Sequence, residues 1–343
     1  MDKLIKNFNT LLEQAQRILV ITHVGPDPDA FTSLILMGTA LELNFPDKQI
    51  VMSTEEQTGD LRPLTGYEKI KLQKLDAAID NLKPDLIIML DAMNFGRCTR
   101  GDTAVIAKKC KALGTKLAII DHHEPVGVET NDVYINQSSP ATAQDVYEIL
   151  FKHLSLKKPA GYAQTALTGI FADSGGFVYE NRRYKETFAL VTELIEAGAK
   201  LETINNLLNQ FSDETIAAIG ELATNSTHTD DYSYSYFSDR FTDDWQAAGK
   251  NFDKLKLGGA HYVNNYIRNI GGRKWGFVVY KDLAAGDDIY GVSLRSVGGE
   301  RDVSKIAAAL GGGGHIPSAG AKVKASNVDE VLELVKKTIL EVK

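Results

Sequence analysis

The sequence has few cysteines, no long apolar run and no excess of basic residues. Cys98 and Cys110 are the only cysteines among 343 residues, and their spacing is not one that binds metal in pairs. This excludes a disulfide framework and favours a reducing, cytoplasmic location. No stretch of about eighteen apolar residues occurs, so we expect no membrane span. The segment MDKLIKNFNTLLEQAQ predicts an amphipathic helix and lacks the features of a signal peptide.

The charge balance is acidic rather than basic. Lysine and arginine number 38 against 45 aspartates and glutamates, which gives a formal net charge of −7. Proteins that bind long duplex DNA without sequence preference usually carry a broad basic face, so this function is excluded. A small anionic ligand could still be held by bound cations and a few local basic side chains.

Apolar strands alternate with helical stretches through the first part of the chain. We expect strands at residues 18–22, 49–53, 85–91 and 116–121. Continuous Ile, Leu and Val strands separated by helices predict a parallel sheet that is covered on both faces. Residues 1–185 are therefore expected to form an open α/β domain.

The pattern changes twice after residue 185. Residues 186–227 predict helices throughout, with Ser212 as the cap of the stretch SDETIAAI, and would form a helical connector. Two-residue alternation then recurs, followed by further helical patterns, which predicts a smaller α/β domain over residues 228–343. A chain of this length is expected to divide into two domains.

Acidic and imidazole side chains gather where the strands of the first domain should end. The carboxyl ends of parallel strands share one edge of the sheet, and ligands bind beyond that edge. Residues far apart in the sequence are therefore expected to converge there. They are His23, Asp27, Asp29, Asp91, Asp121, His122, His123 and, in the segment LTGIFADSGGF, Asp173.

Such a cluster points to bound metal ions. Several carboxylates cannot stay ionised side by side without cations between them. Aspartate and histidine without thiolates suit Mn²⁺ or Mg²⁺, and two ions sharing Asp91 would activate water and stabilise a phosphoryl group under attack. The alternative for single residues is structural: Asp29 could cap a helix beginning at Ala30, and Asp121 could orient a histidine by a hydrogen bond.

The second domain contains a glycine-rich motif, GGGGHIPSAG, at residues 311–320. Glycines let backbone N–H groups approach a phosphate or a base closely, and His315 adds a donor at the mouth of such a loop. Arg295, on an alternating strand, would complete an anion clamp with His315. The alternatives are a flexible turn for the glycines and a surface ion pair for Arg295.

The order of these motifs resembles the DHH phosphoesterase superfamily. The resemblance covers about residues 18–325, and its last segment is similar to the DHH-associated C-terminal domain. The chain looks most like the bifunctional oligoribonuclease and 3′-phosphoadenosine-5′-phosphate phosphatase (nanoRNase) group, because the extra parts of membrane-bound cyclic-di-AMP phosphodiesterases and of long RecJ-type exonucleases are missing. One departure is Pro28, which should stiffen a loop where many relatives have glycine. The motifs are His23-x3-Asp27-x-Asp29, Asp91, Asp121-His122-His123, Asp173 and GGGGH.

The resemblance implies a DHH catalytic domain, a helical connector and a nucleotide-binding domain, with a substrate cleft between the domains. It implies two Mn²⁺ ions, with Mg²⁺ or Co²⁺ as alternatives. One ion would be held by His23, Asp27 and Asp91, and the other by Asp29, Asp91, His122 and Asp173. His123 would contact the substrate phosphate, on the opposite side of the chain from His122, and act in catalysis with Asp91 and His122. The nucleotide would be bound by Arg295, Gly312, Gly313, Gly314 and His315.

The activity implied is hydrolysis of short oligoribonucleotides, including linear dinucleotides, to mononucleotides, and of 3′-phosphoadenosine-5′-phosphate to AMP. Short RNA or DNA oligonucleotides and nucleoside bisphosphates would be the binding partners, without membranes or long duplexes; a homodimer is our working hypothesis. The alternatives are an inorganic pyrophosphatase or exopolyphosphatase and a non-catalytic nucleotide sensor. An exonuclease on long single strands would need a stacking track, but the only candidate, YSYSYF, predicts a half-buried strand instead.

Overall fold

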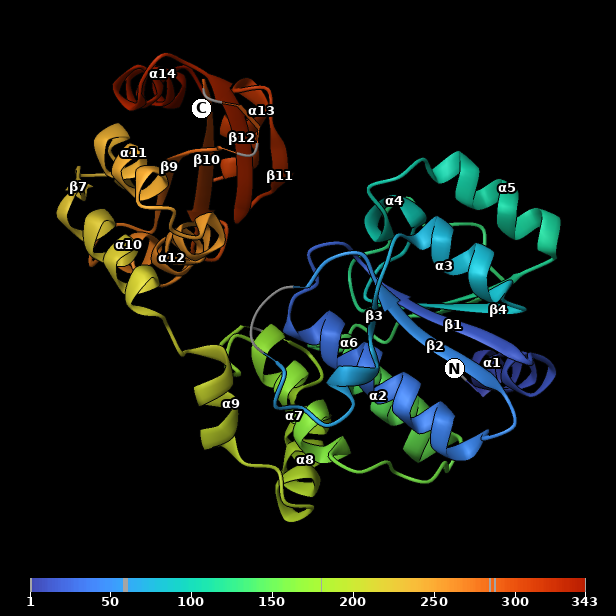
Figure 1. Cartoon of the computed structure of the whole chain (residues 1–343). Helices are drawn as coiled ribbons and strands as arrows, with labels where there is room; N and C mark the ends of the chain where they lie inside the picture. Colours follow the sequence, from blue (N-terminus) through green and yellow to red (C-terminus); the bar gives the residue numbers. More distant parts are fainter. Residues whose placement is uncertain (1, 58–60, 180, 284, 287, 343) are drawn as a thin grey trace. The chain divides into compact units, whose positions relative to one another are not determined.

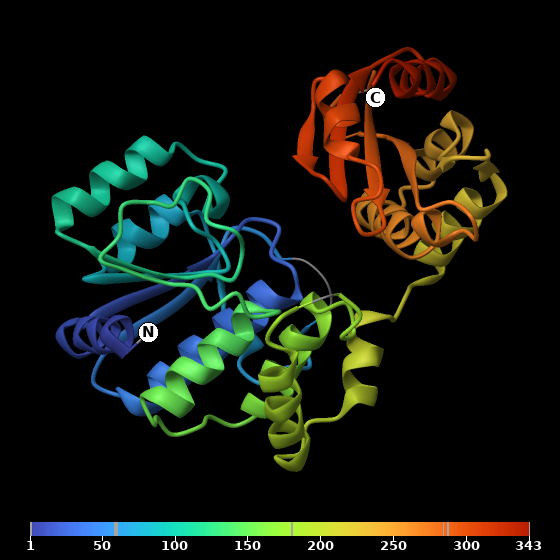
Figure 2. The ribbon, with the colours of Figure 1, turned by 180° about the vertical axis from the view of Figure 1, so that it is seen from behind.

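The computed structural model describes residues 2–57, 61–179, 181–283, 285–286 and 288–342. The chain forms two compact units, Met1–Gln210 and Phe211–Lys343, and each contains its own sheet (Figures 1 and 2). Among the described residues, no helix has both the length and the apolar character needed to cross a membrane.

The first unit is built on a parallel sheet of six strands. Its order is β3-β2-β1-β4-β5-β6, and every neighbouring pair is parallel, which confirms the predicted α/β fold. The two edge strands β3 and β6 were not predicted, because two or three residues are too few to show a pattern. The strands are β1 (Arg17–Thr22), β2 (Gln49–Thr54), β3 (Lys71–Leu72), β4 (Leu86–Leu90), β5 (Lys116–Ile120) and β6 (Val133–Ile135).

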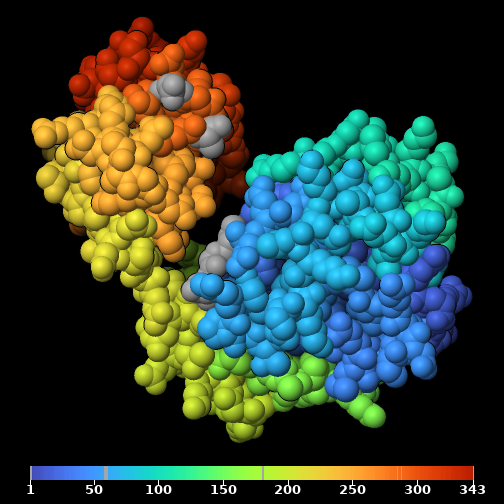
Figure 3. All heavy atoms as spheres, in the orientation of Figure 1, coloured from blue at the N-terminus to red at the C-terminus, as the bar shows by residue number. Residues whose placement is uncertain are grey.

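Helices cover both faces of this sheet because its strands are apolar on both sides. Ile18 and Val20 of β1 belong to the core formed with α1 (Asp2–Gln14), α2 (Pro28–Asn44), α6 (Thr142–Tyr147) and α7 (Tyr162–Asp173). Leu19 and Ile21 point the other way, into the core formed with α3 (Leu75–Leu82), α4 (Phe95–Cys98) and α5 (Thr103–Leu113). In the space-filling view, the near side of this unit consists mainly of the blue-to-cyan first part of the chain (Figure 3). The remaining elements are η1 (Tyr67–Lys69), the π-helical η2 (Glu148–His153), α8 (Tyr184–Glu196) and α9 (Leu201–Leu208).

The second unit contains a mixed six-stranded sheet in the order β11-β12-β10-β9-β8-β7. Among the described residues of this unit, β8 and β9 form the one parallel pair. One face packs on α10 (Asp213–Thr224), α11 (Asp239–Ala247) and α12 (Phe252–Asn265), and the other on α13 (Val303–Ala309) and α14 (Val328–Glu341). The strands are β7 (Thr227–His228), β8 (Ser233–Tyr236), β9 (Trp275–Lys281), β10 (Ile289–Ser296), β11 (Gly313–His315) and β12 (Ser318–Lys324), with η3 at Ile267–Asn269.

The helices predicted over residues 186–227 are divided between the two units. Helices α8 and α9 belong to the first unit and α10 to the second, so the boundary lies after Gln210. Ser212 caps α10 as the sequence predicted, because its side chain accepts a hydrogen bond from the Thr215 N–H at 3.2 Å.

Candidate metal centre

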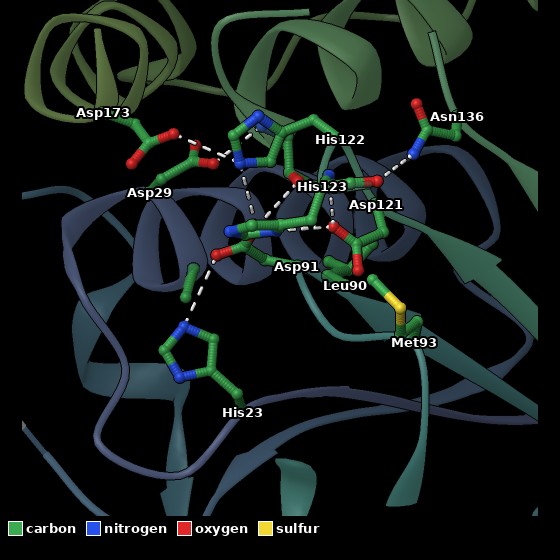
Figure 4. Close-up of polar contacts among 12 residues, drawn as sticks. His23, Asp29, Leu90, Asp91, Met93, Asp121, His122, His123, Asn136 and Asp173 are labelled. Atoms are coloured by element: carbon green, nitrogen blue, oxygen red, sulfur yellow. Dashed lines mark hydrogen bonds and ion pairs between the residues drawn. The ribbon is translucent and has the colours of Figure 1, made fainter. Parts of the chain in front are cut away.

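Three neighbouring strands of the first unit end in one row. The register pairs Thr22 of β1 with Leu90 of β4, and Leu90 with Ile120 of β5. The residue that follows each strand is therefore placed at the same edge of the sheet. These residues are His23, Asp91 and Asp121, and Figure 4 shows their side chains close together.

Asp91 lies at the centre of the cluster. It is 2% exposed, and its φ of +54° is in the left-handed region that few non-glycine residues adopt. Its carboxylate oxygens lie 3.4 Å from His23 Nε2, 3.5 Å from His122 Nε2 and 3.5 Å from His123 Nδ1. Burial alone would raise the pKa of Asp91, but the three imidazoles outweigh it and hold this pKa below its usual value. Asp91 is thus kept as an anion that several partners share.

Asp27 and Asp29 lie at the start of α2 rather than in a loop. The helix begins at Pro28, which suits its first turn, and Asp27 caps it by accepting from the Ala30 N–H at 3.0 Å. Asp29 is fully buried and accepts hydrogen bonds from the N–H groups of Thr142 at 2.7 Å and Ala143 at 2.9 Å. The alternative in which Asp29 caps a helix beginning at Ala30 is therefore wrong, because the helix begins at Pro28 and Asp27 is its cap. Asp29 instead supplies an acceptor to the N-terminus of α6.

Asp173 reaches the cluster from a helix. It is the last residue of α7, so its predicted place at the end of a strand is wrong. Its Oδ2 atom lies 3.1 Å from His122 Nε2. Burial is the main reason that the pKa of Asp173 is raised, to about 6. The pKa of Asp29 is raised as well, mainly by burial and also by the nearby charges of Asp91 and Asp173. Cations at this position would allow these carboxylates to ionise together.

The ring of His122 has a nitrogen atom available for a metal. Its Nδ1 atom lies 3.0 Å from the Ser139 carbonyl oxygen, which fixes Nδ1 as the donor, so Nε2 is the ring nitrogen left for a metal. This Nε2 atom is buried and makes no hydrogen bond with any residue of the described part of the chain. A buried, unsatisfied nitrogen surrounded by carboxylates fits a metal ligand well.

The ring of His123 has different surroundings. Asp121 accepts from the His123 backbone N–H at 3.0 Å and contacts His123 Nδ1 at 2.8 Å. The hydrogen bond with Asp121 is the main reason that the pKa of His123 is raised, to about 9, although burial opposes this shift. The two imidazole centroids are 4.3 Å apart, so the expectation that His122 and His123 point to opposite sides is wrong. Strand alternation does not extend to them because β5 ends at Ile120.

The described residues form three overlapping groups that could hold a metal ion, and the ligand atoms of each lie within 4.8 Å of one another. Asp91 occurs in two of these groups and His122 in two, so neighbouring cations would share ligands. The acidic and imidazole donors suit hard or borderline divalent ions. The groups are His23–Asp27–Asp91, Asp29–His122–Asp173 and Asp91–His122–His123.

Sequence reasoning missed the polar residues that support the cluster. Thr142 Oγ1 donates to Asp91 Oδ1 at 3.0 Å. Arg183 donates to the Ser139 hydroxyl and, at 2.8 Å, to Glu148. The one available signal is indirect: helix α6 follows Ala141, which has no side-chain acceptor, so its cap must come from elsewhere in the fold.

The predicted clamp residues of the second unit share one face of its sheet. Arg295 of β10 pairs with Ser318 of β12, and Ser318 pairs with His315 of β11, so the three side chains form a row across three strands. Arg295 Nε donates to Asn264 Oδ1 at 2.8 Å, which positions the guanidinium over this face.

The glycine motif is a hairpin rather than the expected loop. Gly313 and Gly314 lie in β11, and a Cβ atom on Gly312 would come within 2.2 Å of the Gly320 carbonyl oxygen. A Cβ on Gly314 would meet Ala319 Cα at 2.5 Å, whereas one on Gly313 would meet nothing within 4 Å. Close packing of β11 on β12 therefore explains two of these glycines, and Gly313 faces open space.

Comparisons with known protein families match both units. The description "DHH family, N-terminal domain" fits residues 17–170, and "DHHA1 domain" fits residues 246–341. The bifunctional oligoribonuclease and PAP phosphatase NrnA of Thermus thermophilus is 26% identical over 94% of this chain and 89% of its own length. The protein of the same name from Bacillus subtilis is 25% identical over 89% of both chains. The cyclic-di-AMP phosphodiesterase PdeA of Listeria monocytogenes is 24% identical over 93% of this chain but 47% of its own.

Solved structures share the fold. An exopolyphosphatase-related protein from Bacteroides fragilis has a TM-score of 0.82 at 21% identity, covering 99% of this chain and 96% of that one. The exonuclease RecJ bound to manganese has a TM-score of 0.53 at 12% identity, covering 98% and 93%. At these sequence identities the similarity shows a shared fold and no more.

Proposed function

Because the chain belongs to the DHH phosphoesterase family, a family of metal-dependent hydrolases, we propose that it hydrolyses short oligoribonucleotides to mononucleotides and 3′-phosphoadenosine-5′-phosphate to AMP. The support for this substrate class is the similarity to NrnA proteins over most of both chains. The single observation that carries the chemistry is the convergence of His23, His122 and Asp173 on Asp91 and its neighbours.

We assign two divalent cations, with Mn²⁺ as the expected ion, to the ligand groups of the first unit. His23, Asp27 and Asp91 would hold one. The other would be held by Asp29, Asp91, His122 and Asp173, and the buried Nε2 of His122 supports this set. When bound, the ions would supply an activated water molecule and neutralise charge on the phosphoryl oxygens.

His123 would hold the substrate phosphate. The hydrogen bond with Asp121 raises the pKa of His123, which favours the protonated imidazole, and it occupies Nδ1. The proton on Nε2 is then the one available to a phosphoryl oxygen or to the leaving oxygen. Asp121 acts as a positioning residue, because it fixes both the ring and its charge.

The second unit would bind the nucleotide. Arg295 and His315 offer hydrogen-bond donors in one row, and the open position at Gly313 leaves room for a phosphate beside the strand. Gly312 and Gly314 would contribute through the shape of the hairpin.

A digestion experiment tests the proposal. RNA labelled at either end, two to twenty-four nucleotides long, would be incubated with Mn²⁺, Mg²⁺ or Co²⁺ beside 3′-phosphoadenosine-5′-phosphate, cyclic-di-AMP and polyphosphate. We expect the shortest RNA and the bisphosphate to be cleaved fastest. Faster turnover of polyphosphate or of cyclic-di-AMP would overturn the substrate assignment.

A pair of variants tests the chemistry in the same assay. Asp91→Ala should abolish turnover while the far-ultraviolet circular dichroism spectrum stays native. Asp80→Ala is the matched control, since Asp80 is an exposed partner of Lys109 outside the cluster. Near wild-type turnover by Asp91→Ala would refute the assignment of the centre.

A further inference from the structure

A pocket of about 280 Å³ adjoins the metal centre within the first unit. His122 and Asp173 form the wall that it shares with the centre, and Tyr179, Asn181 and Tyr184 line it elsewhere. Pockets for drug-sized ligands begin at about 300 Å³, so this one has room for a single nucleoside-sized group rather than a dinucleotide. We call it the Tyr179 pocket.

A tight turn after α7 builds one wall of the pocket. Gly175, Gly176 and Phe177 have φ values of +62°, +71° and +68°, which reverse the chain. The Tyr179 N–H then donates to the Ser174 carbonyl at 3.1 Å. A Cβ atom on Gly175 would lie 2.6 Å from Tyr179 Cζ, so glycine is what allows the phenol ring to lie against the backbone here.

Hydrogen bonds hold the other walls in place. The Tyr184 hydroxyl donates to the Tyr179 carbonyl oxygen. Asn181 Nδ2 donates to the Ser138 carbonyl at 3.2 Å, and Asn181 Oδ1 accepts from the Arg183 N–H at 2.8 Å. The Tyr179 side chain nevertheless remains 49% exposed. The ring of Tyr179 therefore lines the pocket and is not buried in the core.

The polar groups around the pocket suit the base of a nucleotide. Its lining among the described residues includes neutral polar side chains, such as Ser138 and Asn181, and no lysine or arginine, although Arg183 donates to the hydroxyl of the lining residue Ser139. The cation that His122 and Asp173 would hold attracts the phosphate to the metal centre, so the planar base of the same nucleotide is the part left to occupy the pocket. Aromatic rings bind bases by stacking, with little dependence on sequence.

We infer that the Tyr179 pocket binds the nucleobase of the nucleotide that carries the attacked phosphate, with the base stacked on Tyr179. This inference rests on the proposed function. It adds Tyr179 as the residue that would make the enzyme prefer nucleotides to phosphate esters that lack a base.

Substrates with and without a base test the inference. We would measure KM for the RNA dinucleotide pApA and for an analogue that lacks one base. The missing base is that of the nucleotide which keeps the attacked phosphate on its 5′ oxygen after cleavage. Calorimetry with Mn²⁺ present would give Kd for AMP and for ribose 5-phosphate. Tyr179→Ala should raise KM for pApA and Kd for AMP about tenfold and change the base-free values less than twofold. Tyr179→Phe should restore both, and Val178→Ala, an exposed neighbour outside the pocket, should resemble wild type.

The kinetic and the calorimetric measurements together separate failure of the inference from failure of the proposed function. An equal change for ligands with and without a base, or no change for either, would overturn the pocket assignment. If wild-type protein does not cleave pApA, the proposed function fails. The comparison of AMP with ribose 5-phosphate then still decides whether the pocket binds a base.

Discussion

His122 and His123 are adjacent in the chain, yet their rings are suited to different tasks. His122 is held through Nδ1 by a backbone carbonyl and has a buried Nε2 facing carboxylates. His123 is held by Asp121, and half of its side chain is exposed. The distinction comes from the partner of each ring, because both follow the same strand end.

Separate substitutions of these histidines should separate metal binding from turnover. His122→Ala should lose bound Mn²⁺ and activity together. His123→Ala should retain metal while kcat for a dinucleotide falls about 10²- to 10³-fold, as expected when one donor to a developing anion is removed. Metal content by mass spectrometry, beside steady-state kinetics, measures both. If His123→Ala loses metal as fully as His122→Ala, then His123 is a ligand, as the group Asp91–His122–His123 would allow.

Asp85 shows how a carboxylate far from the centre contributes to stability. It accepts from the backbone N–H groups of Gln16 at 3.1 Å and Arg17 at 2.9 Å, and contacts Arg17 Nη2 at 2.6 Å. Its hydrogen bond with Arg17 is the main reason that the pKa of Asp85 lies below the usual 3.8. A lowered native pKa adds stability above the unfolded value and loses it as the pH falls through the native value.

Asp85→Asn should therefore destabilise the protein in a pH-dependent way. We expect a loss of about 1 kcal/mol in the free energy of unfolding at pH 7, discounted because the ion pair is partly exposed. The difference from wild type should shrink as the pH falls below about 4. Urea unfolding at several pH values measures this. Asp80→Asn, at an exposed ion pair, is the control and should change little; a pH-independent loss in Asp85→Asn would contradict the explanation.

At the scale of elements, the centre depends on how closely α7 approaches α2 and α6. Gly169 of α7 lies where the three helices meet. A Cβ atom there would lie 2.2 Å from Thr32 Oγ1, 2.8 Å from Ala143 Cβ and 2.9 Å from Asp29 Oδ1. The missing side chain lets Asp29 stay at the N-terminus of α6 and lets α7 carry Asp173 to the cluster.

Gly169→Ala should consequently damage both stability and metal binding. Overpacking of this kind costs about 1–3 kcal/mol, and displacement of Asp29 should weaken Mn²⁺ affinity. Gly220→Ala in α10 is the matched control, because a Cβ there meets nothing within 4 Å and alanine favours a helix by about 1 kcal/mol. Thermal unfolding and metal titration measure the pair. A neutral Gly169→Ala would show that the helices can separate without cost.

The same elements explain how far the sequence could predict the site. His23, Asp91 and His122 were predictable because parallel apolar strands must end at one edge of their sheet. Asp173 was assigned to the right cluster but to the wrong element, since a helix end leaves no strand pattern to follow. The contacts of Thr142 and the capping of α6 by Asp29 depend on how the helices pack. A local sequence pattern cannot predict this packing.

At the scale of the whole molecule, the two units have separate cores, because each buried apolar cluster formed by the described residues draws them from a single unit. The tryptophans provide a selective probe of this division. The sequence contains two, Trp245 and Trp275, and both are buried in the second unit. Tryptophan fluorescence therefore reports the unfolding of that unit, whereas far-ultraviolet circular dichroism reports both.

Removal of metal should then destabilise one unit selectively. A cation that binds only the folded state adds about 2.7 kcal/mol at a hundred times its Kd, and the clustered carboxylates of the first unit repel one another without it. Chelation should lower the circular dichroism transition of the first unit and leave the tryptophan transition within about 1 °C. In Asp91→Asn, chelation should shift neither transition, because the shared ligand is lost. An equal shift of the tryptophan signal in wild type would mean that the metal also stabilises the second unit, so the cluster around Asp91 could not be the only place where the ion acts.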